Sequence, residues 1–339
     1  MEKIAFISNN TFIYWSPLIL ALAITAGIGL YGAVYLRKGG NLYALSISIL
    51  MSAAFGLFFG RLIHWYSRSA AYEGFFRAIT DYSRGGFALA GGFMGCILSA
   101  FVIHRLGLIK SSAKMLDSMA LGGGLAIAAG RLACLFNSAD RGMVLSPKVI
   151  FPFAYPVINA VSGESENRLA TFMFQSILTF GIVAALIAYM VYEKQRAKKI
   201  RDGDICLLFL LAHGAAQIVC DSTRYDSLFF RSNGFVSIVQ ILGLVAMLIP
   251  IVLFSLRLVM RHGLKLWMPG VWVGMIGLVG LAGYMEYYVQ RNAHMAALSY
   301  CLMSASLIAV VFLAVLIWHL GKPTPKPAPA EHTESPAVS

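Results

Sequence analysis

Four charged residues stand inside long apolar stretches of the chain: Arg61, Asp117, Arg131 and Asp221. A charge within a membrane-spanning helix is costly, so each of these residues is a candidate for a functional role. A guanidinium group stays charged and can hold two phosphate oxygens at once, which suits it to an anionic lipid headgroup. The alternative for a single arginine is that its side chain extends to the headgroup layer without binding a ligand.

The charged residues are expected to converge on one face of the membrane. Arg131 follows Asp117 by 14 residues, which at 1.5 Å a residue places it about 21 Å farther along the same helix. Arg61 is expected at a similar height in a helix that runs outward, and Asp221 and Arg224 stand at the outer end of another helix. Several arginines at one leaflet favour a binding site for an anionic headgroup over unrelated surface arginines.

The elements that must position these side chains are membrane helices. Of the 339 residues 59% are hydrophobic and 12% are charged, whereas soluble domains carry about 25% charge. This composition excludes an ordinary soluble protein and a disordered chain. We expect an all-α polytopic membrane bundle of about nine transmembrane helices. The apolar runs that predict them lie near 12–36, 42–66, 86–106, 116–136, 169–192, 204–221, 234–256, 271–288 and 298–320.

Basic residues predict the orientation of these helices. Fifteen of the 27 Lys and Arg residues fall on the side that is reached after odd-numbered helices, and ten fall on the other side. The positive-inside rule then places the N-terminus outside and the C-terminus in the cytoplasm. The proline-broken segment 137–168 is expected to be an outer loop at the interface, and the Pro-rich segment 322–339 a disordered cytoplasmic tail. The net charge of +12 is thus a topology signal, and no nucleic-acid partner is expected.

Cysteine and glycine patterns indicate packing rather than metal chemistry. The five cysteines form no C-x-x-C pair, so we expect no metal site, no disulfide framework and no cofactor. Gly91 and Gly95 have the G-x-x-x-G spacing that allows two membrane helices to approach closely. Alternatively, the Gly91-Gly92 pair loosens its helix so that the backbone lines a cavity.

The segment 130–137 reads G-R-L-A-C-L-F-N and resembles the signature G-R-x-G-N-F-x-N-G-E of the bacterial prolipoprotein diacylglyceryl transferase family. Other blocks resemble family motifs in the same order. They are G-G-F-A-L-A-G-G at 85–92 against G-G-x-S-x-H-G-G, L-D at 116–117, L-A-T-F-M-F-Q-S at 169–176 against H-P-T-x-L-Y-E-S, and Gln217 to Asp226 against R-F-x-x-E-x-x-R-x-P-D. The resemblance covers about residues 12–256.

The resemblance implies a fold, an activity and partners. The family has a seven-helix body with its N-terminus outside, so we expect a transferase-like domain at 1–260, two extra helices within 261–321 and the tail beyond them. The activity implied is transfer of the diacylglyceryl group of phosphatidylglycerol to the lipobox cysteine thiol of a preprolipoprotein signal peptide. The implied location is the bacterial plasma membrane, and glycerol phosphate is released at its outer leaflet.

Several family site residues are replaced by neutral ones in this chain. The histidine of H-G-G is replaced by Ala90, and alanine cannot accept a proton. We nominate His64, at the outer end of the second helix, as a replacement base. The other replacements are Ser16 for Tyr, Cys134 for Asn, Ala139 for Glu, Phe174 for Tyr, Gln175 for Glu and Gln217 for Arg.

The residues expected to bind substrate are those that the chain retains from the family's polar and glycine positions. They are Arg61, Gly91, Gly92, Arg131, Asn137, Asp221 and Arg224. Three functions remain open on the sequence: an active transferase with a remodelled site, a catalytically impaired relative that binds phospholipid or lipopeptide at the outer leaflet, and a small-molecule transporter. The transporter is the least favoured, because matching halves with broken helices are not evident.

Overall fold

The computed structural model describes residues 4–8, 11–69, 72–81, 86–146, 148–158, 162–196, 200–225, 227–229, 236–292 and 295–322. The described residues form helices with four short strands. The helices are α1 (Trp15–Arg37), α2 (Leu42–Ser67), α3 (Phe75–Thr80), α4 (Leu89–Arg105), α5 (Ser112–Arg131), the 3₁₀ helix η2 (Leu132–Phe136), α6 (Thr171–Gln195), α7 (Asp204–Ser222), α8 (Ile238–His262), α9 (Trp267–Arg291) and α10 (Ala296–Leu320). The strands are β1 (Ile4–Ser8), β2 (Thr11–Tyr14), β3 (Ala154–Ile158) and β4 (Ser165–Leu169).

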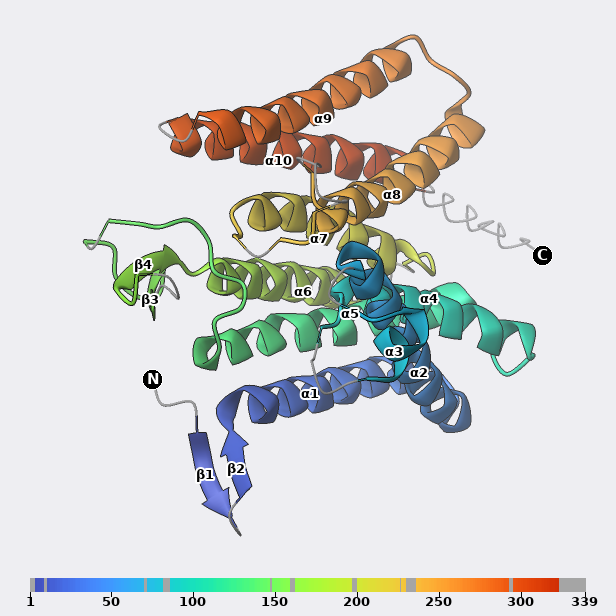
Figure 1. Cartoon of the computed structure of the whole chain (residues 1–339). Helices are drawn as coiled ribbons and strands as arrows, with labels where there is room; N and C mark the ends of the chain where they lie inside the picture. Colours follow the sequence, from blue (N-terminus) through green and yellow to red (C-terminus); the bar gives the residue numbers. More distant parts are fainter. Residues whose placement is uncertain are drawn as a thin grey trace, which may run out of the picture.

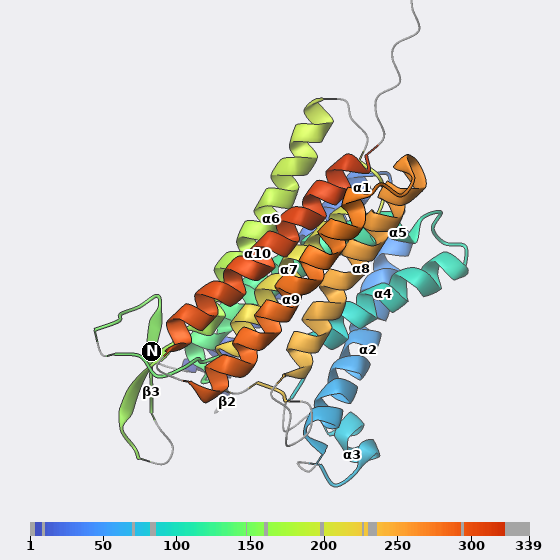
Figure 2. The same ribbon diagram turned by 90° about the horizontal axis from the view of Figure 1, so that it is seen from above.

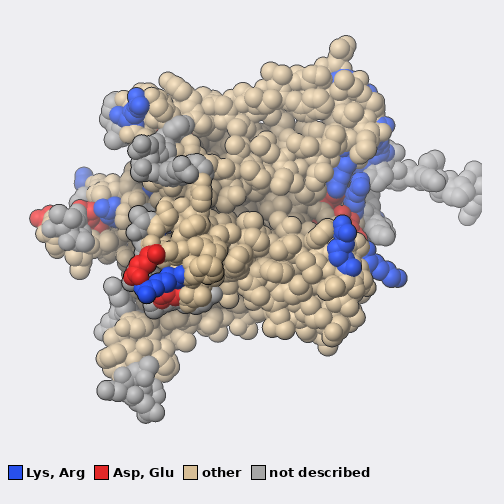
Figure 3. Space-filling view, turned by 45° about the vertical axis from the view of Figure 1, so that its right-hand side comes forward, with Lys and Arg blue, Asp and Glu red and all other residues tan. Residues whose placement is uncertain are grey.

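The long helices make this a multi-pass membrane protein. Eight helices of the described chain are long and apolar enough to cross a membrane. The ninth expected helix is α4, whose 17 residues span about 26 Å. A broad surface without Lys, Arg, Asp or Glu lies between two charged ends (Figure 3). The all-α membrane bundle expected from the sequence is therefore confirmed.

The helices lie side by side across the molecule in an order that differs from the sequence (Figure 1). α1 packs on α5, α5 on α6 and α7, and α7 on α8, while α2 packs along α4. The last two helices lie on the far side from α1, with α10 against α7 and α8, and α9 along α10 (Figures 1 and 2). This order encloses α7 between α6, α8 and α10, and α7 carries several residues of the site described below.

Two antiparallel hairpins at one end of the bundle were not expected from the sequence (Figure 1). The pairs are β1 with β2 and β3 with β4. Residues 12–14, expected to begin the first membrane helix, belong instead to β2, because the backbone stays extended at Tyr14 and α1 begins at Trp15. The predicted outer loop 137–168 contains β3 and the first part of β4, whose paired backbones satisfy each other's hydrogen bonds. We call this end the hairpin end.

Small residues bring α2 and α4 together near the hairpin end. A Cβ atom added to Gly91 would lie 2.0 Å from the backbone nitrogen of Gly60, and one on Gly95 would lie 2.5 Å from that of Gly56. The G-x-x-x-G spacing on α4 therefore faces a second G-x-x-x-G spacing on α2. Gly92 points elsewhere, because a Cβ there would meet nothing within 4 Å.

Replacing Gly91 with alanine is expected to lower the free energy of unfolding by about 1–3 kcal/mol, since the new methyl group must push two helix backbones apart. Gly92→Ala is the matched control on the next residue, and we expect it to be neutral or slightly stabilising because alanine favours helix. Thermal unfolding of both variants in detergent measures the difference. Equal stability of the two variants would contradict the close approach of α2 and α4.

Candidate functional site

A cavity of about 540 Å³ opens between α2, α4, α5, α7 and α8. Its lining is polar toward the hairpin end, where Arg68, Arg131, Asp140 and Arg224 contribute, and apolar farther in, where side chains such as Ile249 of α8 lie. Three arginines against one carboxylate give this lining a net positive charge. An amphipathic molecule with an anionic head matches this arrangement.

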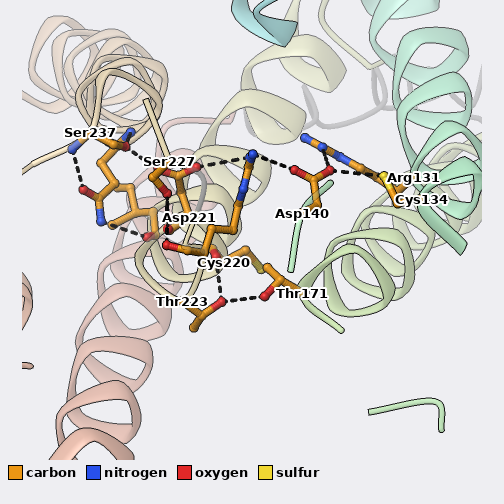
Figure 4. Close-up of polar contacts among 12 residues, drawn as sticks. Arg131, Cys134, Asp140, Thr171, Cys220, Asp221, Thr223, Ser227 and Ser237 are labelled. Atoms are coloured by element: carbon orange, nitrogen blue, oxygen red, sulfur yellow. Dashed lines mark hydrogen bonds and ion pairs between the residues drawn. The ribbon is translucent and has the colours of Figure 1, made fainter. Parts of the chain in front are cut away.

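Asp140 joins the two principal arginines of the cavity. Arg131 ends α5 and Arg224 follows α7, and both form ion pairs with the Asp140 carboxylate. The distance from Arg224 Nη2 to Asp140 Oδ1 is 2.7 Å, and Arg131 approaches Oδ2. Figure 4 shows Asp140 between Arg131 on one side and the group around Asp221 on the other. Asp140 adopts a positive φ of 54°, which is uncommon for a residue other than glycine.

The electrostatics favour an ionised Asp140. Asp140 is 4% exposed, and this burial by itself acts to raise the pKa of its carboxyl group. The charges of Arg131 and Arg224 outweigh burial and hold the pKa of Asp140 below its ordinary value. The carboxylate therefore neutralises part of the arginine charge in the absence of a ligand.

Asp221 extends the polar network from α7 to α8 (Figure 4). It accepts a hydrogen bond from the Ser237 hydroxyl and lies 3.4 Å from Arg224 Nη1. Ser237 also caps α8, because its hydroxyl accepts the backbone N–H of Gln240 while its own N–H donates to the Gln240 side chain. The start of α8 is thus tied to the arginine that lines the cavity.

Arg141 holds the segment that presents Asp140. Its side chain is 1% exposed and lies between the rings of Tyr155 and Phe172, 4.3 and 4.4 Å from their centroids. Its Nη2 donates to main-chain carbonyls within the segment 134–137, at 2.7 Å each. Arg141 therefore fixes the turn between η2 and Asp140 rather than facing the cavity.

The cavity contains three of the residues expected from the sequence. Arg131, Arg224 and His64 line it, and so do Ala90 and Gln217, two of the replaced family positions. His64 Nδ1 lies 2.8 Å from the Tyr72 hydroxyl, and the His64 ring packs against Gly86 at the mouth of the cavity.

Two other expected residues, Arg61 and Asn137, contact protein groups beside the cavity. Arg61 is fully buried, and its guanidinium donates to the main-chain carbonyls of Ala78, Asp81 and Gly86. It therefore ties the end of α3 and Gly86 to α2. Asn137 donates to the Ser16 hydroxyl at 3.0 Å, which ties η2 to the start of α1.

Asp117 lies at the opposite end of the bundle from the arginines. Its carboxylate accepts the backbone N–H groups of Gly203 and Cys206, at 2.9 Å each, and lies 3.7 Å from Lys38 Nζ. A negative charge at the first turn of α7 is stabilising there. Its role in the described structure is to anchor α7.

Sequence reasoning did not select Asp140 and His213, which also line the cavity. Asp140 lies outside the apolar runs, so its charge carried no membrane signal. His213 could have been found, because it is an ionisable residue within the apolar run of α7, one helical turn before Gln217.

Comparison with known proteins identifies the family of the chain. The model of the family "Prolipoprotein diacylglyceryl transferase" matches residues 3–256. The chain belongs to this family. A relative from Clostridium novyi named phosphatidylglycerol–prolipoprotein diacylglyceryl transferase is 25% identical over 258 residues, which are 75% of this chain and 95% of the relative. A protein of the same name from Synechocystis is 26% identical over 216 residues, 63% of this chain and 75% of the relative. The family match ends within α8, so α9 and α10 lie outside it.

Proposed function

We propose that the protein transfers the diacylglyceryl group of phosphatidylglycerol to the lipobox cysteine thiol of preprolipoproteins. The observation that carries the proposal is the amphipathic cavity with Arg131 and Arg224 at its polar end. The choice of this reaction rests on family membership and on the names of the relatives. The phosphate of the lipid would lie between the two arginines, in the place where the Asp140 carboxylate binds them, and the acyl chains would extend along the apolar lining.

The proposed orientation places the hairpin end, and so the arginines, at the outer leaflet, where a lipobox peptide is exposed. The positive-inside asymmetry of the sequence supports this orientation. Reporter fusions at Arg201 and at Asp226, which lies outside the described residues, are expected to report the cytoplasm and the exterior, respectively. A cytoplasmic reporter that is active at Asp226 would reverse the proposed topology.

A second candidate function is lipid binding without transfer. The observation that favours it is the neutral character of Ala90 and Gln217 in the lining, where the family has a histidine and an arginine. Both candidates need the anion site, but only the transferase releases glycerol phosphate. Incubating the purified protein in phosphatidylglycerol vesicles with a synthetic lipobox peptide, and measuring the lipidated peptide by mass spectrometry, separates them.

Arg131→Ala is expected to weaken binding of phosphatidylglycerol by about 10- to 100-fold, because a charge-assisted hydrogen bond contributes about 1.5–3 kcal/mol. Arg291→Ala is the control, since Arg291 ends α9 near the hairpin end and contacts the Tyr287 ring outside the cavity lining. Binding is measured with vesicles of phosphatidylglycerol and of zwitterionic phosphatidylcholine. Equal affinity of the wild-type protein for both lipids would remove the electrostatic basis of the proposal.

A further inference from the structure

Two polar side chains of α7 line the cavity without using their hydrogen-bonding atoms. His213 is 3% exposed, and its Nε2 has no partner among the described residues. Gln217, one helical turn farther along, is 5% exposed, and neither atom of its amide has a partner in the described chain. A buried polar atom without a partner costs about 1–3 kcal/mol, so both side chains are suited to a polar group that enters the cavity.

The imidazole of His213 is held in a fixed position. Its ring stacks on Phe209 with 5.1 Å between centroids, and the ring of Phe93 lies 5.6 Å away. Nδ1 lies 3.4 Å from the hydroxyl oxygen of Thr179 on α6. When Nδ1–H donates to this hydroxyl, Nε2 carries the lone pair and is the nitrogen available to accept a proton.

His213 lies farther from the hairpin end than the arginines do, on the side of the cavity where the acyl chains of the lipid would lie. Gln217 and His213 precede Asp221 by one and two turns, which is about 6 and 12 Å along α7 from the hairpin end. With the phosphate between Arg131 and Arg224, the glyceryl carbon that is bonded to the phosphate oxygen extends toward this level. His64 lies instead near the end of α2, at the headgroup level beside Arg68.

We infer that His213 is the catalytic residue that receives the proton of the lipobox thiol, an inference that rests on the proposed transferase function. The S–H proton passes to Nε2, and the thiolate sulfur attacks the glyceryl carbon that carries the phosphate. A C–S bond forms, the C–O bond breaks, and its electron pair stays on the phosphate oxygen of the leaving glycerol phosphate. The proton on Nε2 passes to that phosphate, which restores the neutral imidazole.

His213→Gln tests the inference, with His104→Gln on the exposed end of α4 as the control. We expect transfer to a synthetic lipobox peptide to fall by about 10²-fold or more in His213→Gln, the lower range for loss of an acid–base group. Binding of phosphatidylglycerol should stay within about threefold, because charge-assisted bonds from the arginines dominate it. His104→Gln should keep the wild-type rate.

A binding measurement decides the inference independently of turnover. Wild-type protein should bind the cysteine peptide about 2- to 10-fold more tightly than the same peptide with alanine, the range for one hydrogen bond, and His213→Gln should lose this preference. If the wild-type protein transfers no diacylglyceryl group to the peptide, the proposed function is wrong. The difference in affinity between the cysteine and alanine peptides would still show whether His213 contacts the thiol. An unchanged rate in His213→Gln, or a wild-type protein that binds both peptides equally, would overturn the inference.

Thr179→Val is the second variant, and it decides the question if His213→Gln does not fold. It removes the partner of Nδ1 and leaves the imidazole in place. We expect a rate loss of about tenfold with unchanged lipid binding, because Nδ1 then has no partner that fixes the tautomer of the imidazole. A wild-type rate in Thr179→Val would contradict the proposed use of Nε2.

Discussion

Replacing Asp140 with asparagine is expected to lower the free energy of unfolding by about 3–5 kcal/mol, the usual range for removing one partner of a buried ion pair. Asparagine tolerates the positive φ that Asp140 adopts, so the variant changes the charge and leaves the backbone unstrained. Arg131 and Arg224 would then face each other without their common counter-ion. Unfolding of the detergent-solubilised protein, without anionic lipid, measures the loss.

The same variant should respond more strongly to an anionic ligand than the wild-type protein. In the wild type a phosphate must compete with the Asp140 carboxylate for both arginines, whereas in Asp140→Asn it supplies the missing negative charge. Phosphatidylglycerol micelles should therefore stabilise the variant more than the wild type. Glu166→Gln is the matched control, because Glu166 pairs with Arg168 on β4, where both side chains are more exposed than Asp140, and its loss should cost less than that of Asp140.

Acid should reduce the difference between the wild type and Asp140→Asn. The folded-state pKa of Asp140 lies below its unfolded-state value of about 4, so its contribution to stability is complete above that value and is lost as the pH falls through the folded-state pKa. Stability measured at neutral pH and in strong acid checks the sign. A variant as stable as the wild type at neutral pH would show that Asp140 does not stabilise the arginine pair.

The membrane helices could be predicted from the sequence because a span needs about 20 apolar residues, which leaves a long and unambiguous signal. The hairpins could not, since strands of four or five residues give too few alternations and both hairpins pair only locally. The start of the first membrane helix was predicted too early for the same reason, because the apolar residues 12–14 are compatible with a strand or with a helix.

The candidate site was predictable where a charge stands in an apolar helix. Arg131 was found in this way, and Arg61 gave the same signal although its guanidinium binds main-chain carbonyls. The sequence cannot distinguish these two arginines, because it does not show which groups they contact. Arg61 donates to main-chain carbonyls, whereas Arg131 pairs with Asp140 in the cavity. Asp140 could not be predicted, because its position depends on a turn that Arg141 stabilises through hydrogen bonds to main-chain carbonyls.

Restoring the family residues at two lining positions is expected to raise the transfer rate. Ala90 and Gln217 line the same cavity, so Ala90→His and Gln217→Arg would place an imidazole and a guanidinium around one substrate. An acid–base group contributes about 10²- to 10⁴-fold, so the gain from Ala90→His should approach this range in the His213→Gln background and be small in the wild type, where His213 supplies the proton acceptor. The two changes should be non-additive, because groups that share one substrate are coupled.

Gln217→Arg alone is expected to be destabilising, because residue 217 is 5% exposed and the change buries a cation there. Gln175 on α6 is 1% exposed with both amide atoms unpaired in the described chain, and the family has glutamate at this position. Since α6 packs against α7, adding Gln175→Glu is expected to recover part of the stability that Gln217→Arg loses. Thermal unfolding of the single and double variants in detergent measures this recovery.

Ala90→His should have its largest effect in the His213→Gln background. If both positions present an imidazole to the same thiol, the restored histidine replaces the lost one and returns most of the rate, whereas in the wild-type background it adds little. Ala90→Asn is the size-matched control, because its amide has no basic nitrogen. The lipidated peptide formed by the four combinations of residues 90 and 213 gives the coupling directly. Equal gains from Ala90→His in both backgrounds would show that the two positions act on different steps, and that His213 is not the residue that compensates for the missing histidine.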